Sequence, residues 1–393
     1  MALHKNNWVR FTVLVVVVIS AALLSGWTAM GSRAPEDRLE ELGLSPNWRD
    51  GMFQNLNRRE DVNLDAAMES WLGPEPDHST PKEPIPIMKR QASDFATPPE
   101  SGFRVTWLGH SSVLVEIDGY RILFDPIWGE RASPFVFMGP QRFHEPPLAL
   151  EDLPPLDAIV ISHDHYDHLD YPTIRHFVQQ RVAFMVPLGV GEHLQYWGVD
   201  KDRITELDWW QSHKIGDLEF TATPARHQSG RTIEATTTRH SLWAGWSVQG
   251  PDHAIYYSGD TSMFPAMAEI GRRLGPFDVT LIDSGAYNQL WRDNHLGPEQ
   301  AVRSHELVGG RLMIPVHWGT FYLAPHSWVE PVERVVAEAK RKGLAVATPR
   351  PGESIEPAHA GADGLVNRWW PNAPWRTAAE YPLVSSGLEG MAE

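Results

Sequence analysis

The stretch AIVISHDHYDHLD, Ala158–Asp170, decides the fold and the chemistry that the sequence predicts. An apolar run ends at Ser162, and three histidines and two aspartates follow within His163–His168. The apolar run is typical of a short buried strand, which ends at the edge of a sheet. His163 and His165 are two residues apart, so their side chains point the same way in an extended chain. Imidazole nitrogens and carboxylate oxygens together suit Zn²⁺ and related divalent ions, so this loop predicts half of a metal site.

The other half of such a site must come from elsewhere, because one loop cannot complete the ligand shells of two metals. Three further metal-binding side chains each follow an apolar run: His227 after FTATPAR, Asp260 after IYYSG and His317 after LMIPV. A single histidine at the end of a strand is most often a structural residue held by hydrogen bonds. Together with the dense loop, however, the three residues predict a dinuclear metal site at the rim of a sheet.

The pattern of apolar residues predicts the fold class. From Phe103 onward, short alternating or fully apolar runs indicate many strands in two batches. Helical patterns lie between them at residues 171–180, 297–310 and 329–343, with Asp170 as the N-cap of the first and Gly309 closing the second. We therefore predict an α/β (α+β) protein with four layers, in which two mixed β-sheets pack face to face and helices cover the outside.

The composition excludes several classes of function. The chain has 393 residues and a net charge of −16, which argues against nucleic acid as a partner, because binding to phosphates needs a basic surface. Cysteine is absent. The chain therefore has no disulfide framework, no thiolate nucleophile and no zinc site built from cysteine.

The N-terminus predicts export. Lys5 and Arg10 precede the mostly apolar run Phe11–Trp27, which is typical of a secretory signal or an uncleaved signal anchor. No cysteine follows the run, which excludes a lipoprotein anchor. We expect the rest of the chain to be periplasmic or otherwise extracytoplasmic, either released or anchored in the membrane.

Changes of composition divide the chain into four parts. We expect a signal peptide or membrane anchor at residues 1–31, a polar and proline-rich arm at 32–100, the hydrolase domain at 101–357 and a tail at 358–393. The tail contains the aromatic cluster VNRWWPNAPW. Two interpretations of this cluster stay open at the level of the sequence: it covers the core, or it contacts lipid.

The opening stretch also resembles a known family. SHDHYDHLD fits the H-x-H-x-D-H signature of the metallo-β-lactamase fold superfamily. Within it, VTWLGHSSVLVEIDG, ELDWWQ, YYSGDTSMF, GPFDVTLIDSGAY and IPVHWGTFYLA resemble the branch of phospholipases D that hydrolyse N-acylphosphatidylethanolamine. The resemblance covers roughly Phe103 to Pro357. It implies the αββα sandwich of that superfamily.

The resemblance also implies two zinc ions per chain, with other divalent metals as alternatives. His163, His165 and His227 would hold one ion. The other would be held by Asp167, His168 and His317. Asp260 would bridge both ions together with a water or hydroxide.

The expected reaction is attack of that bridging hydroxide on a phosphodiester. Two cations lower the pKa of a shared water and neutralise the charge of a phosphoryl group. With N-acylphosphatidylethanolamine the products would be phosphatidic acid and an N-acylethanolamine. Asp167 and Asp260 would take part in catalysis, and in the resembling branch the residue at the position of His295 contacts the substrate phosphate or the leaving group.

Other functions stay open on the same residues. The main alternative is a metal-dependent lactonase or a hydrolase of a small soluble phosphodiester, and the third is a non-enzymatic envelope protein that keeps the metal fold. The expected partners are a phospholipid or other phosphodiester substrate and a membrane surface, and the oligomeric state stays open, a homodimer included. Among the remaining polar residues, we expect Asp164 and Tyr166 to shape the loop, His110 to be structural or to lie behind the ligands and Asp125 to orient a ligand histidine, and we expect no metal contact from His253, His305 and His326.

Overall fold

A computed structural model describes residues 24–60, 75–231, 239–361 and 364–388, together with residues 13, 62, 65, 66, 68, 69 and 73. Most of the predicted signal or anchor, Phe11–Trp27, lies outside the described residues. Among the helices that are described, none is long and apolar enough to cross a membrane.

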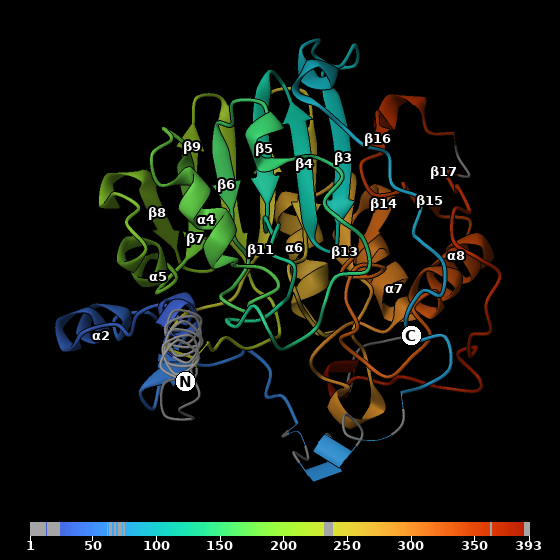
Figure 1. Cartoon of the computed structure of the whole chain (residues 1–393), viewed down its shortest axis with the longest axis horizontal. Helices are drawn as coiled ribbons and strands as arrows, with labels where there is room; N and C mark the ends of the chain where they lie inside the picture. Colours follow the sequence, from blue (N-terminus) through green and yellow to red (C-terminus); the bar gives the residue numbers. More distant parts are fainter. Residues whose placement is uncertain are drawn as a thin grey trace, which may run out of the picture.

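The first sheet has seven strands in the order β16-β3-β4-β5-β6-β7-β8 (Figure 1). Its first half is antiparallel, and β5 to β8 run parallel to one another. The strands are β3 Phe103–Gly109, β4 Ser112–Ile117, β5 Tyr120–Phe124, β6 Ala158–Val160, β7 Ala183–Pro187, β8 Ile204–Leu207 and β16 Ser354–Ile355.

The second sheet has eight strands in the order β17-β15-β14-β13-β12-β11-β10-β9. β9 to β12 are antiparallel neighbours, whereas β12, β13, β14, β15 and β17 pair in parallel. The strands are β9 Ser212–Ile215, β10 Leu218–Thr223, β11 Gly245–Gln249, β12 Ala254–Tyr257, β13 Phe277–Asp283, β14 Gly310–Val316, β15 Ala345–Ala347 and β17 Gly364–Leu365.

Helices cover the outer face of each sheet. α4 Tyr171–Phe177 and α5 Gly191–Tyr196 pack on the first sheet, and α6 Ala266–Leu274, α7 Pro298–Val308 and α8 Glu330–Lys342 pack on the second. The predicted caps are present, since the Asp170 side chain accepts from Thr173 N and Gly309 closes α7 at φ 77°. The 3₁₀ helices are η1 Ala92–Phe95, η2 Leu150–Asp152, η3 Lys201–Arg203, η5 Gln289–Trp291, η6 Pro357–His359 and η7 Ser386–Leu388. The predicted four-layer architecture is confirmed.

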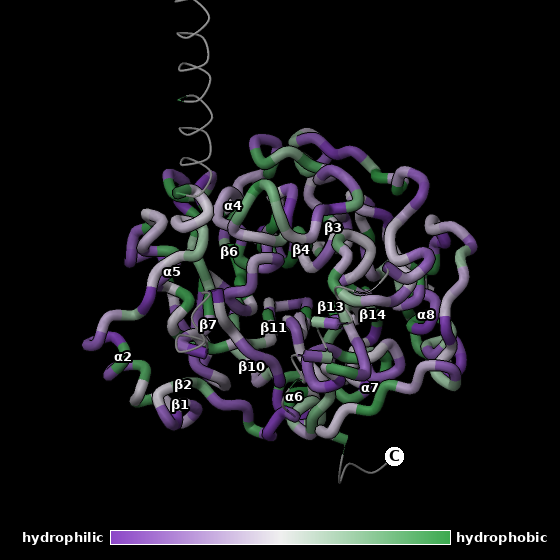
Figure 2. The backbone as a smooth tube through the Cα atoms, turned by 60° about the horizontal axis from the view of Figure 1, so that its bottom comes forward, coloured by the Kyte–Doolittle hydropathy of each residue, from purple (hydrophilic) through white to green (hydrophobic). Residues whose placement is uncertain are grey.

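The largest apolar cluster lies between the two sheets. Val115 and Phe124 of the first sheet and Trp246 and Leu281 of the second belong to it, and all four are fully buried. Replacing one such aromatic side chain by alanine costs about 3–5 kcal/mol, so this layer holds the two sheets together. In Figure 2 hydrophobic stretches run through the strands, while the outer loops are mostly hydrophilic.

The arm and the tail are both part of the packed structure. The arm carries α2 Glu36–Leu42 and a small hairpin, β1 Trp48–Arg49 with β2 Met52–Phe53, and its residues Leu42, Phe53 and Ile85 are buried in the central cluster. In both views α2 lies near α5, at the end of the molecule opposite α8 (Figures 1 and 2). The arm therefore packs on the hydrolase domain through these residues, although its composition is polar.

The tryptophans of the tail pack on the core. Trp369 stacks on Trp318 with 5.2 Å between the ring centroids, and the indole nitrogen of Trp370 donates to Glu333 at 2.8 Å. Trp370 belongs to the central apolar cluster. Of the two interpretations that the sequence left open, the structure supports a tail that covers the core.

Candidate metal centre

The predicted ligands come together at one end of the two sheets. His317 follows β14 directly, and Asp260 lies three residues after β12. β12, β13 and β14 run parallel, so their carboxyl ends lie at one edge. His163 lies three residues after β6 of the other sheet. His227 lies in a loop, four residues beyond the end of β10. The sequence had suggested that His227 closes this strand, which it does not.

A first group of ligand atoms consists of three imidazole nitrogens. The Nε2 atom of His163 lies 2.8 Å from Nδ1 of His165, and Nε2 of His227 lies 3.2 Å from the same atom. Oδ2 of Asp260 lies 3.7 Å from Nε2 of both His163 and His227. These four residues form one of the groups whose donor atoms could hold a single metal ion.

A second group shares Asp260 with the first. Oδ2 of Asp260 lies 3.2 Å from Nε2 of His168 and 3.1 Å from Nε2 of His317. Oδ2 of Asp167 lies 3.3 Å from each of these two nitrogens. One carboxylate oxygen thus lies between the two groups, which is the position that a bridging ligand requires. His110 adds a further contact, with its Nε2 2.9 Å from Oδ2 of Asp167.

The unpaired atoms of the site fit a divalent metal. Among the described residues, Nε2 of His168, Nε2 of His317 and Oδ1 of Asp260 are buried and have no hydrogen-bond partner. A buried polar atom without a partner costs about 1–3 kcal/mol, so native proteins rarely keep several together. Nitrogen and carboxylate ligands in this arrangement satisfy Zn²⁺ and similar ions, which would take up these atoms.

The two groups differ in their electrostatics. Burial and the neighbouring His168 hold the pKa of His163 well below its usual value, and burial does the same for His227. Burial opposes protonation of His317 too, but the Asp260 and Asp167 carboxylates outweigh it and raise the pKa of His317 to about 10. The carboxylates of the second group therefore favour positive charge on its histidines, and a bound cation would replace the protons that these rings carry.

A buried carboxylate supports the second group from behind. Oδ2 of Asp125 lies 2.7 Å from Nδ1 of His168, and the Tyr257 hydroxyl donates to the same oxygen at 2.5 Å. Oδ1 of Asp125 accepts from the backbone N–H of Ser162 at 2.7 Å. Partners of this kind fix the ring and the tautomer of a ligand histidine. The structure thus places Asp125 where it orients His168.

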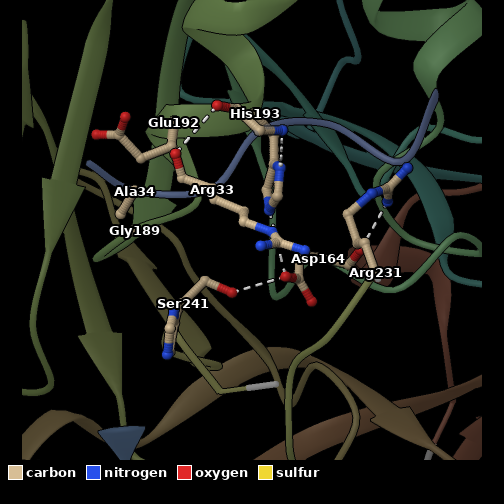
Figure 3. A pocket seen from close by; sticks show the side chains of 10 residues that line it. Arg33, Ala34, Asp164, Gly189, Glu192, His193, Arg231 and Ser241 are labelled. Carbon is tan, nitrogen blue, oxygen red and sulfur yellow. Dashed lines mark hydrogen bonds and ion pairs between the residues drawn. The ribbon is translucent and has the colours of Figure 1, made fainter. Parts of the chain in front are cut away.

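Asp164 anchors the loop that carries the ligands. Oδ1 of Asp164 accepts from Gly230 N at 2.7 Å. Oδ2 accepts from the Ser241 hydroxyl at 2.7 Å (Figure 3). Burial opposes ionisation of Asp164, but His193, 3.4 Å away, and Gly230 outweigh it and hold the pKa of this carboxyl below its usual value. Asp164, which lies between the ligands His163 and His165, therefore fixes their loop to the segments that carry Gly230 and Ser241.

Arg231 fixes the same loop through its backbone. Its guanidinium donates to the carbonyls of Asp164 and Leu169, at 2.6 and 2.7 Å, and lies over the Tyr166 ring at 4.2 Å. It also donates to Ala29 O at 2.7 Å, and Ser32 N donates to Nδ1 of His193 at 3.2 Å. The segment that follows the predicted anchor therefore packs directly behind the metal-binding loop.

His295 lies beside the centre, and sequence reasoning missed its partner. Nδ1 of His295 lies 3.0 Å from Oδ2 of Asp283 and 3.8 Å from Oδ2 of Asp260. Asp283 ends β13 after the apolar run VTLI, which is the same signal that indicated Asp260 and His317. The apolar run before Asp283 was therefore a usable signal, but sequence reasoning did not single out Asp283 among the aspartates.

The three histidines that were predicted to make no metal contact have other partners. Nδ1 of His253 lies 2.6 Å from Asp118, Nδ1 of His305 lies 2.7 Å from the Thr280 hydroxyl, and Nδ1 of His326 lies 3.0 Å from Ser327 O. None of the three belongs to a group of potential metal ligands within the described part of the chain.

Comparison with known proteins agrees with this geometry. Residues 120–318, about half of the chain, match the family described as "Beta-lactamase superfamily domain". The chain belongs to this superfamily. Its donor groups and its relatives make it a metal-dependent hydrolase of the superfamily.

Two proteins with similar sequences and one solved structure illustrate what this chain is similar to. An uncharacterised protein of Mycobacterium tuberculosis (strain ATCC 25618 / H37Rv) is 47% identical over 334 residues, which cover 83% of this chain and 87% of that protein. N-acyl-phosphatidylethanolamine-hydrolyzing phospholipase D 1 of Caenorhabditis elegans is 39% identical over 249 residues, 60% of this chain and 69% of that protein. The structure of a possible metal-dependent hydrolase from Veillonella parvula shares the fold, with a TM-score of 0.52, 19% identity and coverage of 64% of this chain and 98% of that chain.

Proposed function

We propose that the protein is a dinuclear zinc phosphodiesterase that acts on a phospholipid, as a phospholipase D for N-acylphosphatidylethanolamine. The observation that carries the proposal is the position of Asp260, whose Oδ2 lies within 3.2 Å of two ligand nitrogens in one group and 3.7 Å of two in the other. The phospholipid as substrate is supported by the 39% identity to the nematode phospholipase D. The products would be phosphatidic acid and an N-acylethanolamine.

The arrangement suits hydrolysis of a phosphodiester. Two divalent ions, when bound here, would activate water and neutralise negative charge on the phosphoryl oxygens. The protein preorganises the metal ligands, because Asp125 orients His168 and the Asp164 side chain fixes the loop that carries the ligands. Such preorganisation avoids a cost of rearrangement during the reaction. His295 is the partly exposed polar group beside the centre, where it can meet the substrate.

An exposed apolar surface supports contact with a membrane. Val136, Phe137 and Met138 are 53–68% exposed at the tip of the loop between β5 and β6, here called the apolar loop (Ser133–Gly139). Gly26 packs directly on the ring of Phe135, and the exposed Leu24 and Trp27 flank this contact in the sequence. The end of the predicted anchor and the apolar loop thus form one surface. We propose that the protein is exported and that this surface contacts the membrane.

Hydrogen bonds shape the apolar loop and join the chain beyond it to the segment that follows the ligand His317. Arg131 holds the loop in shape by donating to the carbonyls of Val136 and Gly139, at 3.2 and 2.7 Å. At its base, Phe143 N donates to Thr320 O at 2.7 Å, close to the ligand His317.

The decisive experiment is product analysis with defined lipids. Purified full-length protein is loaded with zinc and incubated with vesicles of N-acylphosphatidylethanolamine, phosphatidylethanolamine or phosphatidylcholine. We expect phosphatidic acid and N-acylethanolamine from the first. Diacylglycerol, free fatty acid, or turnover of lactones alone would contradict the proposal, as would fewer than two metals per chain in elemental analysis.

The membrane surface has its own test. Val136→Asp with Phe137→Asp removes two apolar side chains, each worth about 1.5–3 kcal/mol when buried, so vesicle binding should weaken by about a hundredfold or more. Hydrolysis of a soluble phosphodiester should not change. Val384→Asp, at a valine that is 56% exposed on the tail, is the matched control and should bind vesicles normally. Equal weakening in the control would show that added charge, not the apolar loop, matters.

A further inference from the structure

A third buried carboxylate faces the metal centre without belonging to either ligand group as described above. Asp283 is fully buried at the end of β13. Its Oδ2 contacts Nδ1 of His295 at 3.0 Å and accepts from Thr261 N at 3.3 Å. Its Oδ1 accepts from Gly285 N at 3.3 Å and lies 3.8 Å from Nδ1 of His317. The carboxylate therefore lies behind two histidines that face the reaction.

The chemistry of these contacts determines which nitrogen of His295 carries hydrogen. An ionised carboxylate only accepts hydrogen bonds, so the nitrogen that contacts it, Nδ1, must be the donor. Nε2 is then the nitrogen that remains for the substrate. The ring cannot easily turn, because it lies 4.8 Å from the His317 ring and 5.3 Å from the His227 ring, measured between centroids.

Burial of the carboxylate needs an explanation beyond packing. Removing a charge from water costs several kcal/mol unless hydrogen bonds and opposite charges compensate, and an apolar side chain would fill the end of a strand at no such cost. Two backbone N–H groups and two imidazoles surround Asp283. A carboxylate at this position can hold the imidazole nitrogens that contact it in one orientation.

We propose that Asp283 is a positioning residue that fixes His295 so that Nε2 delivers a proton to the leaving alcohol. This inference rests on the proposed phosphodiesterase function. As water attacks phosphorus, the bond between phosphorus and the leaving oxygen breaks, and its electron pair stays on that oxygen. At this point His295 carries hydrogen on both nitrogens, and the leaving oxygen takes the proton from Nε2, which leaves the neutral ring with its hydrogen on Nδ1 towards Asp283. The proton released by the attacking water returns to the ring through solvent, so the reaction consumes one water and no net proton.

The kinetic test varies the leaving group. An alkyl alcohol is a poor leaving group that needs the proton, whereas p-nitrophenol leaves without it. Asp283→Ala should therefore reduce kcat on N-acylphosphatidylethanolamine, or on a soluble alkyl phosphodiester, by about 10²-fold, and kcat on bis(p-nitrophenyl) phosphate by less than about threefold. Asp283→Asn keeps an acceptor oxygen and should lose less. Ser284→Ala is the matched control, since Ser284 is buried beside Asp283 and its hydroxyl donates to Ile282 O at 2.9 Å, with no other hydrogen bond of this hydroxyl within the described residues.

A second readout does not depend on activity. In zinc-loaded protein with ¹⁵N-labelled histidine, the His295 signals, assigned with His295→Gln, should show hydrogen on Nδ1 in a single tautomer, so that Nε2 is the nitrogen that takes up and delivers the transferred proton. Asp283→Ala should lose this single tautomer. A wild-type ring protonated on Nε2 alone would overturn the proposal.

The remaining outcomes separate this inference from the proposed function. Equal loss of kcat on both leaving groups would show that Asp283 is merely structural. Loss of one metal ion per chain in Asp283→Ala would make it a ligand, because Asp260, Asp283, His295 and His317 also lie close enough to hold an ion. If wild-type protein cleaves soluble diesters but no lipid, the lipid substrate is wrong, and the comparison of alkyl and aryl diesters still decides the role of Asp283.

Discussion

The two ligand groups of the metal centre are supported by different kinds of partner. In the first group, Nδ1 of His163 contacts the Ser162 hydroxyl and Nδ1 of His227 contacts the Asn294 carbonyl, each at 2.9 Å. In the second group, Nδ1 of His168 contacts the Asp125 carboxylate at 2.7 Å. A carboxylate behind an imidazole makes it a more basic ligand than a neutral oxygen does. We therefore expect the second group to bind its metal more tightly than the first.

The largest effect should come from the residue that the two groups share. Asp260→Asn keeps the size of the side chain but removes the charge that lies between the groups. The affinity of both groups for metal should therefore fall, and the difference between the two affinities should shrink. Turnover of a phosphodiester should fall on the order of a thousandfold or more, because the charge neutralisation supplied by two metals is worth several kcal/mol. Turnover and metal content are measured on the same sample, with a thermal melt to show that the fold persists. Unchanged turnover would mean that Asp260 is not the bridge.

A smaller effect should separate the two groups. Asp125→Asn removes the carboxylate behind His168, and affinity for the metal of the second group should fall about 10–100-fold. Ser162→Ala is the matched variant for the first group, since it removes the hydroxyl that contacts Nδ1 of His163 and leaves the Asp125 carboxylate behind His168 in place. Competition with a chelator measures both affinities. If Ser162→Ala weakens binding as much as Asp125→Asn, the difference between carboxylate and neutral support has no consequence for affinity.

The sequence predicted best those features that depend on neighbouring residues. Alternating apolar residues and strand-end polar residues were enough for the two sheets, the outer helices and the set of residues that meet at the centre. The pattern works because parallel strands such as β12, β13 and β14 bring their carboxyl ends to one edge. Any polar residue just beyond those ends then approaches the others, however far apart they are in the sequence.

Features that depend on distant contacts were not predictable in this way. Ser32 contacts His193 across 161 residues, and the polar composition of the arm gives no sign that Leu42 and Phe53 are buried in the core. Asp283 follows an apolar run as Asp260 does, but its contacts with His295 and His317 are set by the fold and are not visible in the sequence. The partners of a ligand are chosen by the three-dimensional packing, which a pattern along one strand does not contain.

The smallest effect expected from the difference between the groups is in the number of protons that each group releases when it binds its metal. The carboxylates raise the pKa of His168 and His317 in the metal-free protein, and His317 reaches about 10, so at pH 7 both rings carry protons that a metal must displace. His163 and His227 have lowered pKa values and are neutral at pH 7, so the first group releases none. Loading both metals should release about two protons per chain, all with the second group, and affinity there should rise with pH towards 10. Calorimetry in buffers of different ionisation enthalpy counts them, and equal release from both steps would contradict the electrostatic difference between the groups.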